Sequence, residues 1–154
     1  MKRQYYLAYG SNLNIGQMQF RCPAAEPVGK TLLTGYRLTF CGGNGSAVAN
    51  IEPDNESIVP CALWRITAED ERALDGYEGF PYLYHKTTVR VPFGKRKISA
   101  MVYVMEDGHP VGMPGRGYLR TILEGYADFE LDTFALAEAV RTSVAVHEPY
   151  GSSE

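Results

Sequence analysis

The sequence predicts an α+β fold in which a mostly antiparallel sheet or barrel carries attached helices. Up to residue 105 the chain consists mainly of short apolar or alternating runs between turns, a pattern typical of strands. After the Gly- and Pro-rich segment 108–117, apolar residues recur at helical spacing. The regular alternation of strand and helix that marks a doubly wound fold is missing.

The expected strands are apolar runs that end at turn residues. The strongest turn signal is Gly42-Gly43-Asn44-Gly45, a second turn is expected at Pro53-Asp54-Asn55, and Phe93-Gly94-Lys95 is expected to join a hairpin. The strands predicted between these turns cover residues 5–8, 30–33, 36–41, 47–51, 58–66, 84–91 and 98–105.

Capping residues mark the helices. Asn14 can cap a first helix, and Thr67, with Asp70 three residues later, can cap a second that ends near residue 74. Gly76 and Gly79 suit the exit from that second helix. Asp132 can cap the last helix. Two C-terminal helices are expected from the spacing of Tyr118, Ile122, Tyr126, Leu136, Val140 and Val144.

Chain length, net charge and the lack of long apolar runs limit the classes of protein to which this sequence can belong. The 154 residues can build one hydrophobic core, and we expect a single domain over 1–150 with a frayed tail over 151–154. A formal net charge of −3 argues against a nucleic-acid partner. No apolar run approaches the roughly 18 residues that cross a bilayer, and the N-terminus does not resemble a signal peptide. We therefore expect a soluble, cytoplasmic protein with no membrane partner.

Cysteine and histidine are scarce, with three of each. The cysteines are about twenty residues apart and odd in number, so small core residues are expected rather than a disulfide framework. The histidines form no metal-ligand motif, so no metal site is expected. The eleven tyrosines should mostly be half-buried residues of strands and helices.

The first candidate for chemistry is the segment Tyr9-Gly10-Ser11-Asn12-Leu13, named the 9–13 loop below. It follows a predicted strand and precedes a helix, where backbone N–H groups are free and the helix end is positive. Gly10 lets a ligand approach the backbone, while Ser11 and Asn12 add side-chain donors. The loop suits a carboxylate or a developing oxyanion. The alternative is an ordinary capped turn.

The second candidate is Glu78, which lies at the end of a short acidic helix between two glycines. The helix dipole disfavours a carboxylate there, and desolvation and neighbouring acidic residues would also raise its pKa. A raised pKa would make Glu78 a better general base near neutral pH. The alternative is a solvated glutamate in a surface turn.

Both segments resemble signatures of the γ-glutamylcyclotransferase-like family. The 9–13 loop resembles the first, and Leu74-Asp75-Gly76-Tyr77-Glu78-Gly79 resembles the second, which holds the catalytic glutamate of that family. Shorter matches lie at 21–23, 33–38, 60–64 and 118–125, so the resemblance extends from about residue 4 to 140.

The resemblance implies a small mixed β-barrel with flanking helices that releases 5-oxoproline from a γ-glutamyl compound without a cofactor. The substrate's own α-amine would attack its γ-amide carbonyl, with Glu78 as general base and then acid. Backbone N–H groups of the 9–13 loop would hold the γ-carbonyl oxygen or the α-carboxylate. Tyr84 follows Glu78 at about the family spacing, with Tyr82 as an alternative, and Tyr118 matches a tyrosine that helps line the pocket of relatives. The expected substrate-binding residues are Tyr9, Gly10, Ser11, Asn12, Leu13, Tyr84 and Tyr118.

Two other functions remain open at this point. The same pocket could serve a non-catalytic module that binds a γ-glutamyl compound or another small carboxylate. It could also belong to a cyclotransferase for γ-glutamyl-amines or for a γ-glutamyl-protected metabolite. A homodimer is compatible with the sequence, although no heptad or long apolar stripe argues for it.

Overall fold

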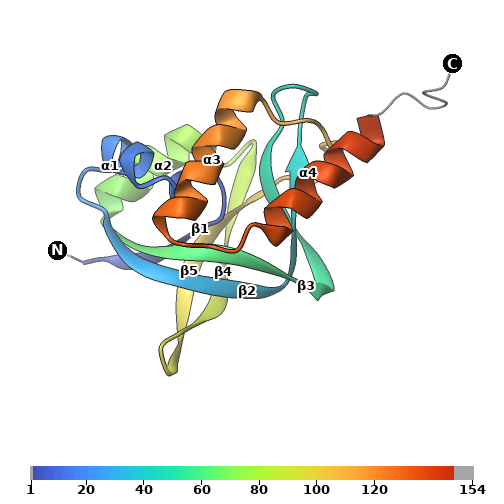
Figure 1. Ribbon diagram of the computed structural model, residues 1–154. Coiled ribbons are helices and arrows are strands. Elements are labelled where there is room, and N and C mark those ends of the chain that lie inside the picture. The colour runs from blue at the N-terminus through green and yellow to red at the C-terminus, as the bar shows by residue number, and fades with distance from the viewer. Residues whose placement is uncertain (1, 148–154) are drawn as a thin grey trace, which may run out of the picture.

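A computed structural model describes residues 2–147, without the side chain of His147, and shows one mixed sheet flanked by helices (Figure 1). The end of the expected domain at residue 150 and the expected tail 151–154 lie outside the described residues. The elements are β1 (Gln4–Ala8), η1 (Ser11–Leu13), α1 (Ile15–Arg21), β2 (Glu26–Cys41), β3 (Val48–Ile66), α2 (Ala68–Glu78), β4 (Tyr84–Phe93), β5 (Arg96–Met105), α3 (Arg116–Asp128) and α4 (Phe134–His147).

The five strands lie in the order β2-β3-β1-β5-β4, and all neighbours are antiparallel except β1 and β5. The α+β, mostly antiparallel prediction is therefore confirmed. The sheet is not closed by backbone pairing, so the word barrel is too strong. Edge strands β2 and β4 meet through side chains instead: Thr31 donates to the carbonyl of Pro92, and the Phe93 ring lies against Gly29. Pro92 has no N–H with which to extend a ladder toward β2.

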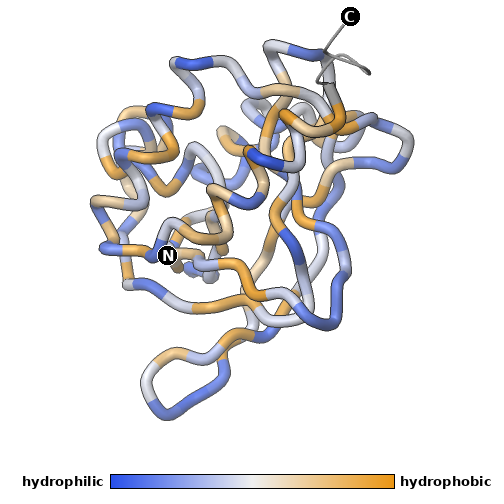
Figure 2. The backbone as a smooth tube through the Cα atoms, turned by 45° about the vertical axis from the view of Figure 1, so that its right-hand side comes forward, coloured by the Kyte–Doolittle hydropathy of each residue, from blue (hydrophilic) through white to orange (hydrophobic). Residues whose placement is uncertain are grey.

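The hydrophobic core lies between the sheet and the helices and draws side chains from every strand. Its largest fully buried side chains include Trp64, Phe40 and Tyr126. All three cysteines are buried and free, as the sequence predicted. Outside the core, the polar tip of the β4–β5 hairpin projects from the body of the molecule (Figure 2).

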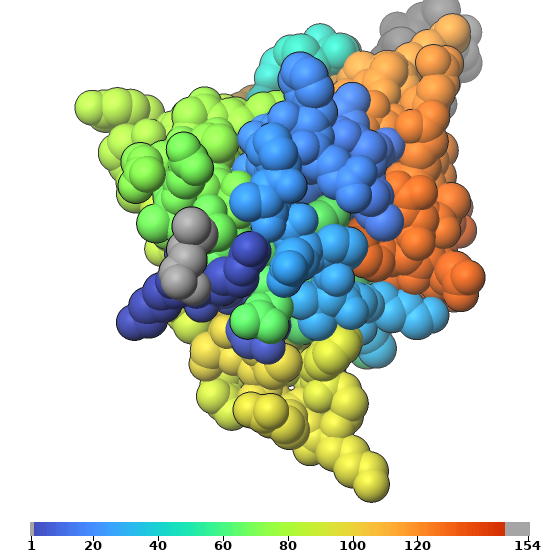
Figure 3. Space-filling model, turned by 90° about the vertical axis from the view of Figure 1, so that its left-hand side faces the viewer, coloured from blue at the N-terminus to red at the C-terminus, as the bar shows by residue number. Residues whose placement is uncertain are grey.

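The helix caps follow the predicted chemistry, but α2 is longer than expected. The Asn14 side chain accepts from the N–H of Gln17, and Thr67 and Asp70 exchange both bonds of a capping box. The predicted end of α2 near residue 74 is wrong, because the helix continues through Gly76 to Glu78. One face of the molecule shows α1 between α2 and α3 (Figure 3).

The turn predicted at Pro53-Asp54-Asn55 is a bulge rather than a chain reversal. Strand β2 pairs Tyr36 with Pro53 and Thr34 with Ile58, so Gly35 alone lies opposite residues 54–57. Gly35 adopts φ 84°, which glycine tolerates best.

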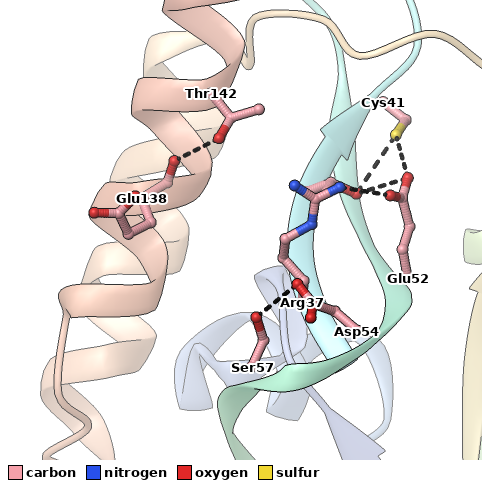
Figure 4. Close-up of polar contacts among 8 residues, drawn as sticks. Arg37, Cys41, Glu52, Asp54, Ser57, Glu138 and Thr142 are labelled. Atoms are coloured by element: carbon pink, nitrogen blue, oxygen red, sulfur yellow. Dashed lines mark hydrogen bonds and ion pairs between the residues drawn. The ribbon is translucent and has the colours of Figure 1, made fainter. Parts of the chain in front are cut away.

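Within the bulge, the Asp54 carboxylate accepts from the N–H of Glu56 at 3.0 Å. It also accepts from the Ser57 hydroxyl at 2.9 Å (Figure 4). Local polar bonds of this kind also occur in turns, and here they let one continuous β3 replace the two strands that we predicted.

No helix among residues 2–147 is long and apolar enough to cross a membrane.

Candidate active site

A cavity of about 250 Å³ opens where β1 ends, beneath η1 and beside the end of α2. It collects side chains from the start of β3, from β4 and β5, and from α3, so distant parts of the sequence meet there. The lining residues are Tyr6, Leu7, Tyr9, Gly10, Ser11, Asn12, Val48, Ala49, Tyr77, Glu78, Leu83, Tyr84, Tyr103 and Tyr118.

The structure brings seven of the eight predicted site residues to this cavity: Tyr9, Gly10, Ser11, Asn12, Glu78, Tyr84 and Tyr118. The exception is Leu13, whose side chain is fully buried and faces Gly125 of α3. The N–H of Leu13 already donates to the carbonyl of Gly10 at 3.0 Å. Tyr82, the alternative to Tyr84, is 88 % exposed and does not line the cavity.

Glu78 is the last residue of α2, and Gly79 ends the helix in the left-handed conformation with φ 65°. Burial raises the pKa of the Glu78 carboxyl to about 7, although the nearby Arg21 guanidinium opposes this rise. No hydrogen bond or ion pair ties the carboxylate to another side chain in the described part of the chain. The carboxylate can therefore accept and return a proton near neutral pH.

Two tyrosines of the cavity bind the backbone of one residue, Ala49. The Tyr84 hydroxyl donates to the Ala49 carbonyl at 2.6 Å, and the Ala49 N–H donates to the Tyr118 hydroxyl at 2.8 Å. A hydroxyl carries one hydrogen, so Tyr84 has used its own, whereas the hydrogen of Tyr118 remains to be donated. Tyr118 can thus supply a donor to a ligand in the cavity.

The 9–13 loop passes close to the same wall. A Cβ atom on Gly10 would lie 3.1 Å from the Ala49 Cβ and 3.5 Å from the Tyr118 hydroxyl, so a larger residue would narrow the cavity. No side chain caps η1, and the N–H groups of Ser11 and Asn12 at its start have no acceptor within the turn. These two N–H groups are candidates to hold an anionic oxygen.

The side chains of the loop are less available than its backbone. The Ser11 hydroxyl is 2.9 Å from the Tyr77 hydroxyl, and the Asn12 amide donates to the Tyr6 hydroxyl at 2.9 Å. The Asn12 side-chain oxygen accepts from Arg21. Asn12 therefore acts mainly as an anchor of the loop, and the predicted use of its amide as a ligand donor is restricted to one remaining hydrogen.

Sequence reasoning did not single out several wall residues, among them Tyr6, Tyr103 and Ala49. Tyr103 donates to the Asp75 carboxylate at 2.6 Å, and its carbonyl accepts from the Tyr9 hydroxyl at 2.8 Å. These contacts depend on strand register and on the placement of α2, so no local sequence signal could have revealed them. Tyr77 precedes Glu78 in the second signature, and that adjacency is the one available hint.

The described residues contain no group of three or more His, Cys, Asp or Glu that could hold a metal ion. The cavity offers instead one carboxylate, several hydroxyls and two backbone N–H groups. This donor set suits proton transfer and the binding of a small anionic group.

Comparisons with known proteins place the fold. Solved structures with the same fold include one described as gamma-glutamyl cyclotransferase, at TM-score 0.81 and 22 % identity over 90 % of this chain and 86 % of that chain. An uncharacterized protein from Homo sapiens matches at TM-score 0.81 and 22 % identity, over 93 % of this chain and 89 % of that one. YkqA from Bacillus subtilis matches at TM-score 0.79 and 21 % identity, over 93 % of this chain and 56 % of its own.

A search of curated proteins finds no match. The sequence model described as "Gamma-glutamyl cyclotransferase, AIG2-like" matches residues 6–122, which include the whole cavity lining. The chain belongs to the gamma-glutamyl cyclotransferase, AIG2-like family.

Proposed function

We propose that the protein is a cofactor-independent γ-glutamylcyclotransferase that converts a γ-glutamyl compound into 5-oxoproline and a free amine or amino acid. The observation that carries the proposal is the unpaired Glu78 carboxylate with a pKa near 7, in one cavity with the Tyr118 hydroxyl and the N–H groups of Ser11 and Asn12. Family membership and the shared fold support the same reaction class.

The chemistry requires little beyond these groups, because the nucleophile is part of the substrate. The substrate's α-amine attacks the γ-carbonyl carbon, a new C–N bond closes the five-membered ring, and the original amide C–N bond breaks. Two protons leave the attacking nitrogen and end on the departing nitrogen. Glu78 can carry each in turn, first as base and then as acid.

The anionic oxygens are the other charges that need partners. The γ-carbonyl oxygen becomes negative in the tetrahedral intermediate, and the α-carboxylate is negative throughout. The N–H groups of Ser11 and Asn12 and the hydroxyl of Tyr118 are donors suited to these two groups. A cavity of about 250 Å³ leaves little room for an extended γ-glutamyl chain, which favours a folded pose with the α-amine near the γ-carbonyl.

The test is Glu78→Gln, which keeps the size of the side chain and removes its titration. With a panel of γ-glutamyl dipeptides, γ-glutamyl-amines and glutathione, 5-oxoproline formation should fall by at least about 100-fold. The matched control is Glu138→Gln, which changes an exposed glutamate of α4 and should retain wild-type turnover. Unchanged turnover in Glu78→Gln would refute the assignment. Binding of a γ-glutamyl compound by the wild type without any product would identify a binding module instead.

A further inference from the structure

We infer that a second hollow beside the cavity is the subsite for the departing amine, and that Phe20 there contacts apolar side chains of the leaving group. The inference rests on the proposed function. This outer hollow has a volume of about 620 Å³ and lies between α1, the end of α2 and α3. Its lining residues are Asn14, Gly16, Gln17, Phe20, Arg21, Tyr77 and Glu124.

Tyr77 lies between the outer hollow and the catalytic cavity. It is the one residue in the described part of the chain that lines both. It also directly precedes Glu78, the group that would protonate the departing nitrogen. In the proposed arrangement, the leaving group of a substrate whose scissile amide lies at Glu78 extends past Tyr77 into the outer hollow.

The small size of the catalytic cavity, called the inner cavity here, is a second reason to place the leaving group in the outer hollow. About 250 Å³ is below the roughly 300–1,000 Å³ of pockets that enclose a whole drug-sized ligand. The ring-forming γ-glutamyl part must lie inside with Glu78, so a bulky leaving group has to extend outward. The outer hollow, at about 620 Å³, is the larger of the two spaces that Tyr77 lines.

The walls of the outer hollow are held in place by polar contacts. The Arg21 guanidinium carbon lies 3.5 Å from the centre of the Tyr77 ring, and Arg21 also donates to Gln17 at 3.0 Å. On the other side, the Asn14 amide donates to the Glu124 carboxylate at 3.0 Å. These contacts fix two walls of a preformed subsite.

Phe20 is an apolar side chain of the outer hollow that the rest of the protein leaves uncovered. Its side chain is 90 % exposed, while the Tyr77 side chain beside the same hollow is 45 % exposed. A leaving group with a large apolar side chain would cover part of Phe20 and remove that surface from water. The favoured substrates are thus γ-glutamyl conjugates of amines or amino acids with bulky apolar side chains.

The test compares two dipeptides that differ only in the side chain of the leaving group, γ-glutamylglycine and γ-glutamylphenylalanine. The measured quantity is the ratio of their kcat/KM values, phenylalanine over glycine, from 5-oxoproline formation. Phe20→Ala should lower this ratio about fivefold, because part of an apolar contact is lost. Phe20→Leu should lower it less. Phe20 is exposed, so these variants should fold as the wild type does.

Phe134→Ala is the matched control, since Phe134 is 68 % exposed but lies on α4, outside both hollows. It should leave the ratio at the wild-type value. Turnover of both dipeptides with the same ratio in wild type and Phe20→Ala would overturn the subsite while the proposed function stands. Absence of 5-oxoproline from the wild type with these two dipeptides and with the rest of the γ-glutamyl panel would refute the proposed function, and the subsite with it. Turnover of other members of the panel but of neither dipeptide would overturn the subsite alone.

Discussion

Replacement of Glu78 by glutamine should make the protein more stable at alkaline pH, in addition to its effect on catalysis. Burial raises the pKa of this carboxyl from 4.5 to about 7 in the folded protein. Below pH 4.5 both the folded and unfolded states hold the proton, so burial of the neutral group adds no charge penalty. As the pH rises toward 7 the unfolded state releases its proton first, and the free energy of unfolding falls. Well above pH 7 both states have released the proton, and the free energy of unfolding falls no further on account of Glu78.

The size of the effect follows from the proton affinity. A tenfold change in proton affinity is worth about 1.36 kcal/mol, so the rise of the pKa from 4.5 to about 7 lowers the free energy of unfolding by roughly 3 kcal/mol in total. Between about pH 5 and about pH 9 the wild type should therefore lose about 2 to 3 kcal/mol relative to Glu78→Gln. The glutamine cannot ionise, so other titrating groups cancel in the comparison of the two proteins.

Urea unfolding at several pH values, followed by fluorescence, gives this difference directly. Trp64 is the single tryptophan and is fully buried, so its emission reports the loss of the core. Equal slopes of the unfolding free energy against urea in both proteins would show that the midpoint change reflects stability. A difference in stability that stays constant from about pH 5 to about pH 9 would refute the raised pKa, and with it the electrostatic basis of the proposed mechanism.

Two further substitutions test the surroundings of Glu78. Arg21→Gln removes the charge that lowers the pKa of Glu78, so the acidic limb of the pH dependence of kcat/KM should move to higher pH. Arg21→Lys keeps the charge and should leave this limb near its wild-type position. An acidic limb that does not move in Arg21→Gln would contradict the effect of Arg21 on Glu78. Tyr118→Phe leaves the Ala49 N–H without its acceptor and removes a donor from the cavity, so thermal unfolding should show a loss of about 1 kcal/mol and kcat/KM should fall. Wild-type values of both would show that the hydroxyl has neither role.

The parts of the fold that the sequence predicted well are those decided by neighbouring residues. The capping box of Thr67 and Asp70 and the turn at Gly94 depend on atoms a few residues apart. The bulge opposite Gly35 was not predicted, because Pro53 and Asp54 have the composition of a chain reversal as well as of a bulge. Only pairing with a partner strand decides between the two, and that pairing is set by residues far along the chain.

The residues of the candidate site also fall into two groups, those indicated by their local sequence and those brought to the cavity by contacts with distant strands. Glu78 and the 9–13 loop lie at helix ends with their own glycines, so local chemistry, strengthened by the resemblance to a family, singled them out. Ala49 and Tyr103 reach the cavity through strand register, and each has no distinguishing feature in its own segment. The sequence also overstated Asn12, since only the structure shows that Arg21 and Tyr6 occupy its amide.

Burial in the cavity sets the proton affinity of Glu78, and Arg21 opposes it. Gly10 and Ala49 pack closely in one wall of the cavity, where a Cβ atom on Gly10 would lie 3.1 Å from the Ala49 Cβ, so a larger residue at position 10 would be crowded. Tyr9, Tyr84 and Tyr118 line the same cavity, and their hydroxyls bond to the backbone of Tyr103 or Ala49 rather than to Glu78. A buried carboxyl without a hydrogen-bond partner of its own holds its proton more tightly than one in water. The proposed cyclisation thus depends on an unpaired carboxylate in a buried cavity, with Arg21 as the nearby cation that moderates its pKa.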